Sequence, residues 1–264
     1  MRAHPASHPG APAIEMRHVS AGSMRDESTV VVEEVDWTVA VGDYWVIAGL
    51  QGSGKSDFLM MAAGLMPPLS GSYRFFGEEM PIFDEALLKD RLRLGMVFET
   101  GQLFNHLTVA ENVALPVRYH RNLTKAEAEP EVQKLLDALE LGPLADSTPG
   151  AIGRNWQKRV GLARALALEP EVLIVDSPLT GLDLRHVQWW LSFLDQLSKG
   201  HALLHGRPVT LVVTTADLRP WKGRARQFAI LKNKRLSVLG SWKQLESASH
   251  ELIQELLATE QPSA

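Results

Sequence analysis

The chain has 264 residues, of which 45% are hydrophobic and 22% charged, with a formal net charge of −4 and no cysteine. This composition is ordinary for a globular protein, and it excludes disulfides, thiolate metal sites and thiol catalysis. The mild negative charge gives no indication of a nucleic-acid partner. Since no apolar run approaches the ~20 residues that span a bilayer, any membrane contact is expected to be peripheral.

The pattern of apolar residues predicts one domain over residues 14–258, between flexible tails at 1–13 and 259–264. Continuous Val/Ile/Leu runs are typical of strands buried on both faces of a parallel sheet, and their alternation with helices predicts an α/β fold. The segment 103–168 holds helical patterns and no strand, so it is expected to be an inserted helical subdomain. In chain order, strands are predicted at Ala13–Val19, Thr29–Val39, Tyr44–Ala48, Gly71–Phe76, Leu94–Phe98, Val172–Val175, Val209–Thr214, Gln227–Leu231 and Leu236–Leu239, and helices at Lys55–Leu65, Thr124–Leu139, Trp156–Leu168, Leu184–Leu197 and His250–Leu257.

A phosphate-binding loop is predicted at Gly49–Ser56, which matches the pattern G-x-x-x-x-G-K-[ST] in full. It lies between the apolar run Tyr44–Ala48 and a helical segment, the strand–loop–helix context that this motif requires. Its glycines allow backbone N–H groups to converge on phosphates, while Lys55 neutralises charge and the Ser56 hydroxyl reaches Mg²⁺. The predicted nucleotide-binding residues are Gly49, Gln51, Gly52, Ser53, Gly54, Lys55, Ser56 and Asp57.

A second phosphate-related element is the buried run Val172–Val175, which ends in Asp176. Ligands of open parallel sheets bind at the carboxyl ends of the strands, so Asp176 is expected to hold Mg²⁺ together with Ser56. The simpler reading is a strand followed by an Asp-Ser-Pro turn, which is a common sequence for a turn. The phosphate loop upstream favours the Mg²⁺ role.

The order of these motifs, followed by Lys158–Leu166 and Thr180–Asp183, resembles the ATP-binding subunits of ABC transporters. The segments Leu103–Val113 and Leu115–Arg118 look most like the Mla-type phospholipid-transport ATPases. The resemblance implies a P-loop NTPase fold: a RecA-like core with a mostly parallel sheet, an N-terminal antiparallel β part and an inserted helical subdomain. It also implies Mg-ATP as ligand, a second ABC subunit in a homo- or heterodimer, an integral-membrane permease as partner, and a cytoplasmic, peripheral location on the inner face of the plasma membrane.

Several residues depart from the pattern of that family. Ser177 stands where the family has the glutamate that polarises the attacking water, and Ala216 where it has the switch histidine. Glu99 replaces a glutamine near Mg²⁺, so it is a candidate Mg²⁺ ligand. The segment Ile152–Trp156 replaces the LSGGQ signature, and Ser20–Ser23 lacks the aromatic residue that stacks on adenine. Loss of a general base alone slows a reaction by roughly 10²–10⁴, so we expect ATP to be bound while its hydrolysis is lost or strongly impaired.

Three alternatives stay open. Glu99 could act as a displaced base in an active ATPase, and Arg154 could act as an arginine finger toward a partner-bound phosphate. The third alternative is an ATP-binding scaffold without a permease. The apolar residues after Glu99 bear on that third alternative, because they would form either a docking groove for a permease or the interior of the helical subdomain. They are Phe104, Leu107, Val109, Leu115 and Pro116.

Overall fold

The computed structural model describes residues 10–26, 28–80, 88–248 and 251–257. The chain forms two compact units: Met1–Ile82 with Val212–Ala264, and Phe83–Leu211. The predicted tail at 259–264, most of the predicted tail at 1–13, and His250 of the predicted last helix lie outside the described residues. Ala13 is fully buried and its carbonyl accepts a hydrogen bond from Phe76 N, so ordered packing already includes residue 13.

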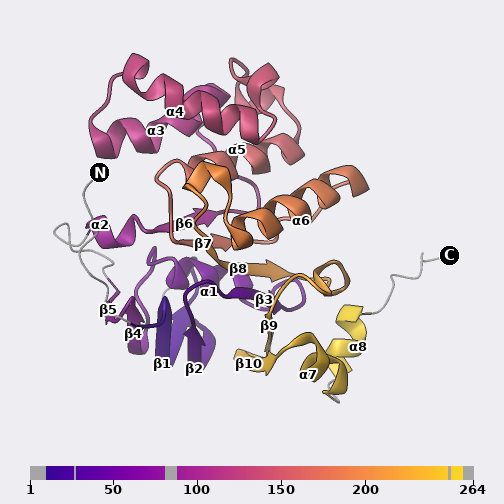
Figure 1. Cartoon of the computed structure of the whole chain (residues 1–264). Helices are drawn as coiled ribbons and strands as arrows, with labels where there is room; N and C mark the ends of the chain where they lie inside the picture. The colour runs from indigo at the N-terminus through magenta and orange to yellow at the C-terminus, as the bar shows by residue number, and fades with distance from the viewer. Residues whose placement is uncertain (1–9, 27, 81–87, 249–250, 258–264) are drawn as a thin grey trace. The chain divides into compact units, whose positions relative to one another are not determined.

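The first unit contains an antiparallel sheet of four strands in the order β2-β1-β4-β5 (Figure 1). Its strands are β1 (Ile14–Gly22), β2 (Val30–Val39), β4 (Ser70–Phe75) and β5 (Glu78–Glu79). Strand β4 comes so close to β1 that a Cβ on Gly71 would overlap the carbonyl of His18. This sheet confirms the expected N-terminal antiparallel part, and β5 is an addition that the sequence pattern did not predict.

The same unit carries the strand that leads into the phosphate loop. Strand β3 (Tyr44–Ala48) is buried at every residue and pairs in parallel with β9 (Gln227–Lys232), which pairs antiparallel with β10 (Arg235–Gly240). Strand β8 (Thr210–Thr215) neighbours β3 on its other side. The loop continues into α1 (Lys55–Ala62), and α7 (Trp242–Ser247) and α8 (Glu251–Leu257) follow the sheet. Phe58 of α1 packs its ring against Trp37, with 5.6 Å between the ring centroids, which anchors α1 in the core of this unit.

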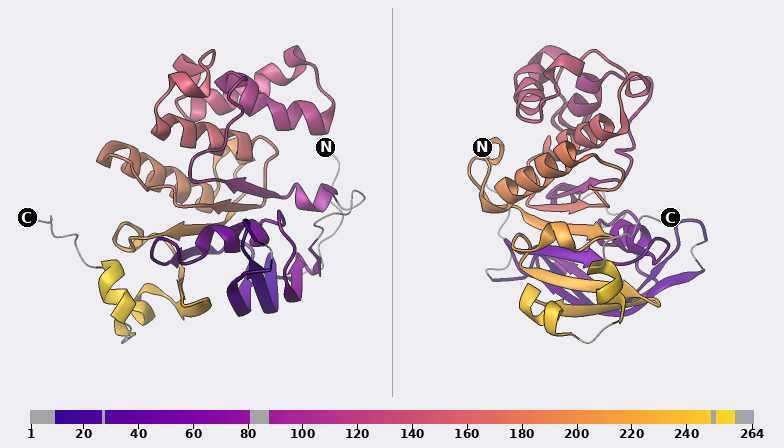
Figure 2. Two further views of the ribbon diagram at one scale, coloured as in Figure 1. Left: turned by 180° about the vertical axis from the view of Figure 1, so that it is seen from behind. Right: turned by 90° about the vertical axis from the view of Figure 1, so that its right-hand side faces the viewer.

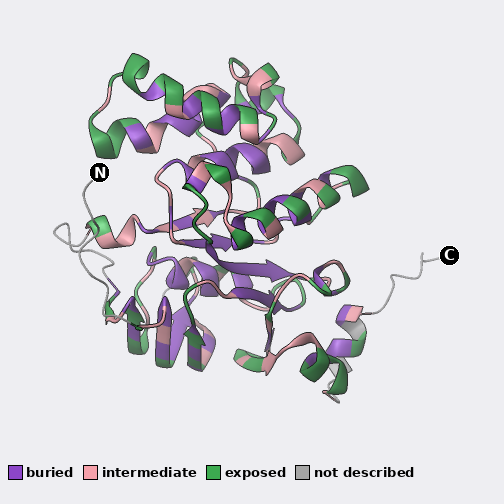
Figure 3. Ribbon diagram, in the orientation of Figure 1, coloured by how far each residue is buried: buried purple, intermediate pink, exposed green. Residues whose placement is uncertain are grey.

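The second unit combines parallel strands with helices. Strands β6 (Leu94–Val97) and β7 (Val172–Val175) pair in parallel, and β7 is buried along its whole length (Figure 3). The helices are α2 (Leu88–Arg91), α3 (Val109–Arg121), α4 (Lys125–Ala138), α5 (Arg154–Leu166) and α6 (Leu184–Lys199). Helices α3, α4 and α5 contact one another pairwise, and their ribbons lie side by side in both views of Figure 2.

Local sequence explains where these helices begin. Capping boxes start α3 and α4: Thr108 and Thr124 accept hydrogen bonds from the backbone N–H three residues on, and the glutamates at those positions bond back. Asp183 caps α6 by accepting from His186 N. Gly153, in an extended conformation, precedes α5, which therefore begins at Arg154, two residues before the predicted start.

Candidate functional site: a phosphate loop and a carboxylate edge

The phosphate loop spans the turn between β3 and α1. Gly52 and Gly54 adopt φ values of 78° and 92°, a left-handed region that a side chain makes costly. Gly49 leaves no room for a Cβ, which would lie 2.7 Å from both Leu231 O and Ser53 Oγ. Among the described residues, no side chain caps the first turn of α1. The amide groups at this N-terminus, together with the helix dipole, therefore form an anion-binding end of the helix.

Lys55 folds back over the loop that precedes it. Its ammonium donates to the carbonyls of Gly49 and Leu50 at 2.6 and 2.8 Å and to Ser53 Oγ at 3.4 Å, and the side chain is buried. These three acceptors place the charge inside the curve of the loop. A phosphate bound there would meet a lysine that is already in position, in addition to the exposed hydroxyl of Ser56.

Asp57, predicted to contact nucleotide, is turned toward the loop between β1 and β2. Its carboxylate accepts a hydrogen bond from Met24 N at 2.8 Å, which joins residues 33 positions apart. Met24 follows Ser20–Ser23, the segment without an aromatic residue, and its side chain is exposed. In the first unit, Asp57 thus ties this segment to the first turn of α1.

Ala216 lies at the end of β8, beside the entry to the phosphate loop. Gly49 N donates to Thr215 O at 3.1 Å, so the residue before Ala216 is directly hydrogen-bonded to the first residue of the loop. Ala216 itself is exposed, and its methyl group neither donates nor accepts a hydrogen bond. The position that the resemblance assigned to a switch histidine is therefore next to the phosphate loop but chemically inert.

In the second unit, Asp176 and Ser177 follow β7 directly. Asp176 is 5% exposed and accepts a hydrogen bond from Ser177 Oγ at 3.2 Å. Ser177 has a φ of 44°, so the chain turns sharply after the aspartate. A hydroxyl that donates to this carboxylate is oriented as a hydrogen-bond donor toward Asp176.

Lys158 of α5 occupies the loop that follows β7. Its ammonium donates to the carbonyls of Ser177, Pro178 and Thr180 at 3.2, 3.3 and 2.7 Å. Burial lowers the pKa of Lys158, while the carboxylates of Glu99 and Asp176 act in the opposite direction. Both carboxylates therefore act on the same ammonium.

The oxygen donors of these segments fit the chemistry of Mg²⁺. Carboxylate and hydroxyl oxygens are the ligands that this ion prefers, and it is commonly held by one or two carboxylates plus phosphate oxygens. Asp176 and Glu99 supply carboxylates, and both favour the charged form of the Lys158 ammonium, although burial lowers the pKa of this lysine. Within the described residues, no group of three or more histidine, aspartate or glutamate side chains is arranged to hold a metal ion by itself. Mg²⁺ at this edge would draw its other ligands from water or from the phosphate oxygens of a nucleotide.

The loop after Glu99 is packed tightly on α5. A Cβ on Gly161 would lie 2.9 Å from Gly101 Cα, and Gly101 has a φ of 77°. Arg164 donates from its two terminal nitrogens to the carbonyls of Gly101 and Gln102, each at 2.9 Å. The backbone next to Glu99 is thus fixed to the helix that follows the signature segment.

The segment Ile152–Trp156 leads into a cluster of aromatic rings around Arg159. The Arg159 guanidinium lies 3.7 Å from the ring centroid of Trp189 and 4.7 Å from that of Trp156. It donates to Glu140 Oε2 at 2.8 Å and to His186 Nδ1 at 3.1 Å. Asn155 contacts the other ring nitrogen of His186. We call Asn155, Trp156, Arg159, His186 and Trp189 the arginine cluster; it connects the start of α5 to α6.

The predicted docking residues after Glu99 separate into two groups. Val109 is fully buried, which favours the interior alternative for this residue, whereas Phe104 is exposed. Leu107, Leu115 and Pro116 are half-buried. The docking groove therefore stays a prediction for the residues that are exposed or half-buried.

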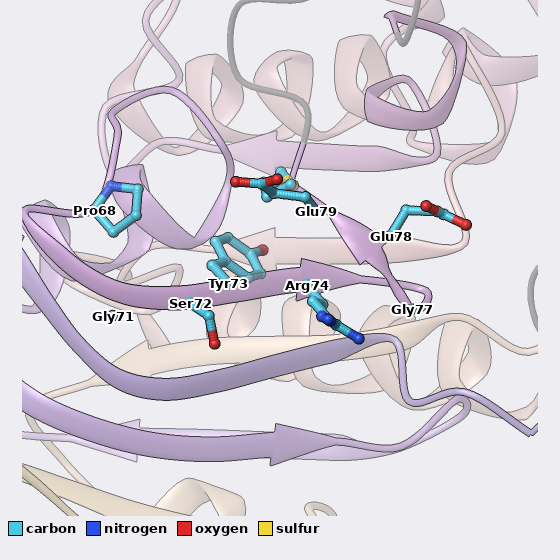
Figure 4. A pocket seen from close by; sticks show the side chains of 9 residues that line it. Pro68, Gly71, Ser72, Tyr73, Arg74, Gly77, Glu78 and Glu79 are labelled. Atoms are coloured by element: carbon cyan, nitrogen blue, oxygen red, sulfur yellow. The ribbon is translucent and has the colours of Figure 1, made fainter.

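A cavity of about 570 Å³ lies in the antiparallel part of the first unit (Figure 4). Tyr73 and Arg74 of β4 and Glu78 and Glu79 of β5 line it. The Tyr73 hydroxyl already donates to Ala62 O at 2.5 Å, and burial raises the pKa of this phenol well above its ordinary value. None of the predicted nucleotide-binding residues lines this cavity.

Comparison with known proteins identifies the family. A family model described as "ABC transporter" matches residues 32–180, which is more than half of the chain. The chain belongs to the ABC transporter family of ATP-binding subunits. Similar proteins include the "Sulfate/thiosulfate import ATP-binding protein CysA" of Synechococcus elongatus, 34% identical over 84% of this chain and 62% of its own length. The "Methionine import ATP-binding protein MetN" of Lacticaseibacillus paracasei is 32% identical over 84% of this chain and 62% of its own. The chain thus spans about three-fifths of the length of these relatives.

Solved structures confirm the fold. The "Dimeric structure of a post-hydrolysis state of the ATP-binding cassette MJ0796 bound to ADP and Pi" superposes with a TM-score of 0.74 at 26% identity, over 84% of this chain and 96% of that one. The structure of "cbiO1 from clostridium perfringens", described as part of an ABC transporter complex, also gives a TM-score of 0.74, at 22% identity over 90% and 91% of the two chains. The predicted P-loop NTPase fold of ABC cassettes is therefore correct. Among the described residues, no helix is both long and apolar enough to cross a membrane.

Sequence reasoning did not find Lys158 or the arginine cluster as parts of the site. Lys158 stood inside the motif Lys158–Leu166 without a role, and its carbonyl partners lie 19 to 22 positions away. The pair Trp189 and Trp190 was visible in the sequence, but only the fold shows that Trp189 covers Arg159 whereas Trp190 enters the core.

Proposed function

We propose that this chain is the ATP-binding subunit of an ABC-type transporter that binds Mg-ATP and hydrolyses it very slowly or not at all. The observation that carries the proposal is Ser177, whose hydroxyl donates to Asp176 at the position where the family has a catalytic carboxylate. The phosphate loop, by contrast, keeps its left-handed glycines and its folded-back lysine. Binding and turnover are thus expected to be separated in this chain.

The proposed ligand contacts follow from the chemistry of each group. Backbone amides and Lys55 would bind the phosphates, Ser56 would reach Mg²⁺, and Asp176 and Glu99 would supply Mg²⁺ ligands in the second unit. When bound, Mg²⁺ would neutralise phosphate charge. The remaining proposed nucleotide contacts are Gly49, Gln51, Gly52, Ser53, Gly54 and Asp57, although Asp57 already binds Met24 N.

The proposed setting is that of an import-type subunit, because the relatives are import ATP-binding proteins by their names. We propose a second ABC subunit and a membrane permease as partners, and a cytoplasmic, peripheral location at the inner face of the plasma membrane. Lipid as the transported substrate rests only on the Mla-like segments Leu103–Val113 and Leu115–Arg118, since these relatives are named for sulfate and methionine. ATP binding without hydrolysis would still act as a switch, because a ligand that prefers one state shifts populations.

The alternative function is a slow ATPase with Glu99 as a displaced base. The carboxylates of Glu99 and Asp176 act on the same Lys158 ammonium, which supports this alternative. A base must lie within about 3 Å of the water it activates. Replacing Glu99 by glutamine would then abolish residual turnover while leaving ATP binding intact.

A single-turnover experiment tests the proposal. Excess protein is mixed with γ-labelled Mg-ATP, and bound ATP and released phosphate are followed for an hour, with Lys55→Ala as the non-binding control. We expect retained, uncleaved ATP on the wild-type chain and none on the control. Conversion of bound ATP to ADP and phosphate within minutes would contradict the proposed loss of hydrolysis. If Glu99→Gln then abolished this conversion, Glu99 would be established as the displaced base. Equal retention by the wild type and Lys55→Ala would overturn ATP binding at the phosphate loop.

A further inference from the structure

Lys158 is a buried cation in a shell of oxygen atoms. The residue is 6% exposed, and its Nζ donates to three backbone carbonyls, of Ser177, Pro178 and Thr180. Three donors on the ammonium match these three acceptors, so the hydrogen-bonding capacity of the group is filled. All three carbonyls belong to the segment that follows Asp176.

Two carboxylates also act on this ammonium electrostatically. Glu99 and Asp176 both act electrostatically on Lys158 and favour its charged form against the effect of burial. An ammonium held by three carbonyl oxygens, in the field of two carboxylates, occupies the kind of environment that oxygen-binding metal ions also select. The lysine therefore already neutralises one of the two negative charges that the sheet edge offers to a divalent cation.

We propose that Lys158 is a resident cation that lowers the affinity of the Asp176–Glu99 edge for a divalent metal ion and positions the segment Ser177–Thr180. The proposal deepens the proposed function, on which the role of this edge as a Mg²⁺ site rests. A fixed positive charge repels a second cation, and in a partly buried environment this repulsion is only partly screened. Lys158 would then make metal binding dependent on the phosphates of a nucleotide, which supply the missing negative charge.

Binding of Mn²⁺ to the nucleotide-free full chain tests the idea, with the electron paramagnetic resonance signal of free Mn²⁺ as readout. We expect weak binding by the wild type and binding on the order of tenfold tighter in Lys158→Gln, since one nearby unit charge is removed. Lys158→Arg keeps the charge and should bind Mn²⁺ like the wild type. Lys134→Gln, which removes a lysine from the exposed surface of α4, is the matched control and should leave Mn²⁺ affinity unchanged.

A second comparison keeps the test valid if Lys158→Gln does not fold. In the wild-type background, Glu99→Gln should weaken Mn²⁺ binding, because it removes one of the two carboxylates. Unchanged Mn²⁺ affinity in a folded Lys158→Gln chain, or in Glu99→Gln, would overturn the proposal. Because no nucleotide is present, this result is independent of the ATP-retention experiment, so failure of ATP binding and failure of the resident-cation role are distinguishable.

Discussion

Replacement of Arg159 by methionine is expected to lower the free energy of unfolding of the second unit by about 3 kcal/mol. Methionine keeps the apolar stem but loses two hydrogen bonds from a charged donor, worth ~1.5–3 kcal/mol each, and two ring contacts of ~1 kcal/mol each. Release of the buried charge offsets several kcal/mol of this loss. The guanidinium is 2% exposed, so water does not replace its contacts in the folded protein.

Glu140→Gln is the matched variant, because it removes the opposite charge of the same ion pair. The Glu140 side chain is 53% exposed, so water replaces much of its interaction and the expected cost is below about 1 kcal/mol. Urea denaturation followed by circular dichroism measures both variants, and the Arg159→Met midpoint should fall by roughly 1 M. Equal losses for the two variants would show that the ion pair, rather than the tryptophan rings and His186, stabilises this cluster, and would refute the reasoning.

Three further results are expected from α3 and the loop that precedes it. Gly101→Ala should lower the melting temperature more than the exposed substitution Thr100→Ala. The reason is that a Cβ on Gly101 would overlap the Gln157 carbonyl, and that Gly101 has a φ of 77°. Equal melting temperatures for the two variants would contradict this prediction. Asn112→Leu should lower the free energy of unfolding by roughly 2–4 kcal/mol in urea titration, because four backbone groups lose a buried hydrogen-bond partner. These groups are Phe104 N, Phe104 O, Leu107 O and Thr108 O. A loss below about 1 kcal/mol would contradict this prediction. The pKa of Glu111 is lowered mainly by the Thr108 backbone N–H, so its stabilising effect is present above the ordinary value of 4.5 and is lost as pH falls through the lowered value. Helical circular dichroism of Glu111→Gln should therefore differ from wild type at pH 7 and converge with it in acid.

The phosphate loop and the buried strands could be predicted, because each depends on residues that are close together in the sequence. The phosphate loop is fixed by glycines and a lysine at set spacing within eight residues, and the buried strands Tyr44–Ala48 and Val172–Val175 were predicted with the observed bounds. The helix over Val109–Arg121 was not delimited, since Pro116, which lacks an amide donor, lies inside it. Its start was nevertheless encoded by Thr108 and Glu111, a capping box that the sequence shows.

Contacts between distant segments could not be predicted. The bond from Met24 N to Asp57 spans 33 positions, and it depends on how the loop between β1 and β2 folds over α1. The three carbonyls on Lys158 converge only because Ser177 turns the backbone through a left-handed conformation. The departures at Ser177 and Ala216 are predictions from the sequence, whereas the donation of the Ser177 hydroxyl to Asp176 required the structure.

The backbone contact between Gly101 and Gly161 has a practical consequence for spectroscopy. The chain contains no cysteine, so a single cysteine introduced at the exposed Thr100 would provide a unique attachment point for a spin label or fluorophore. Because the neighbouring Gly101 is packed on Gly161 and its carbonyl is bonded to Arg164, such a label would report the orientation of α5 rather than independent motion of a loop.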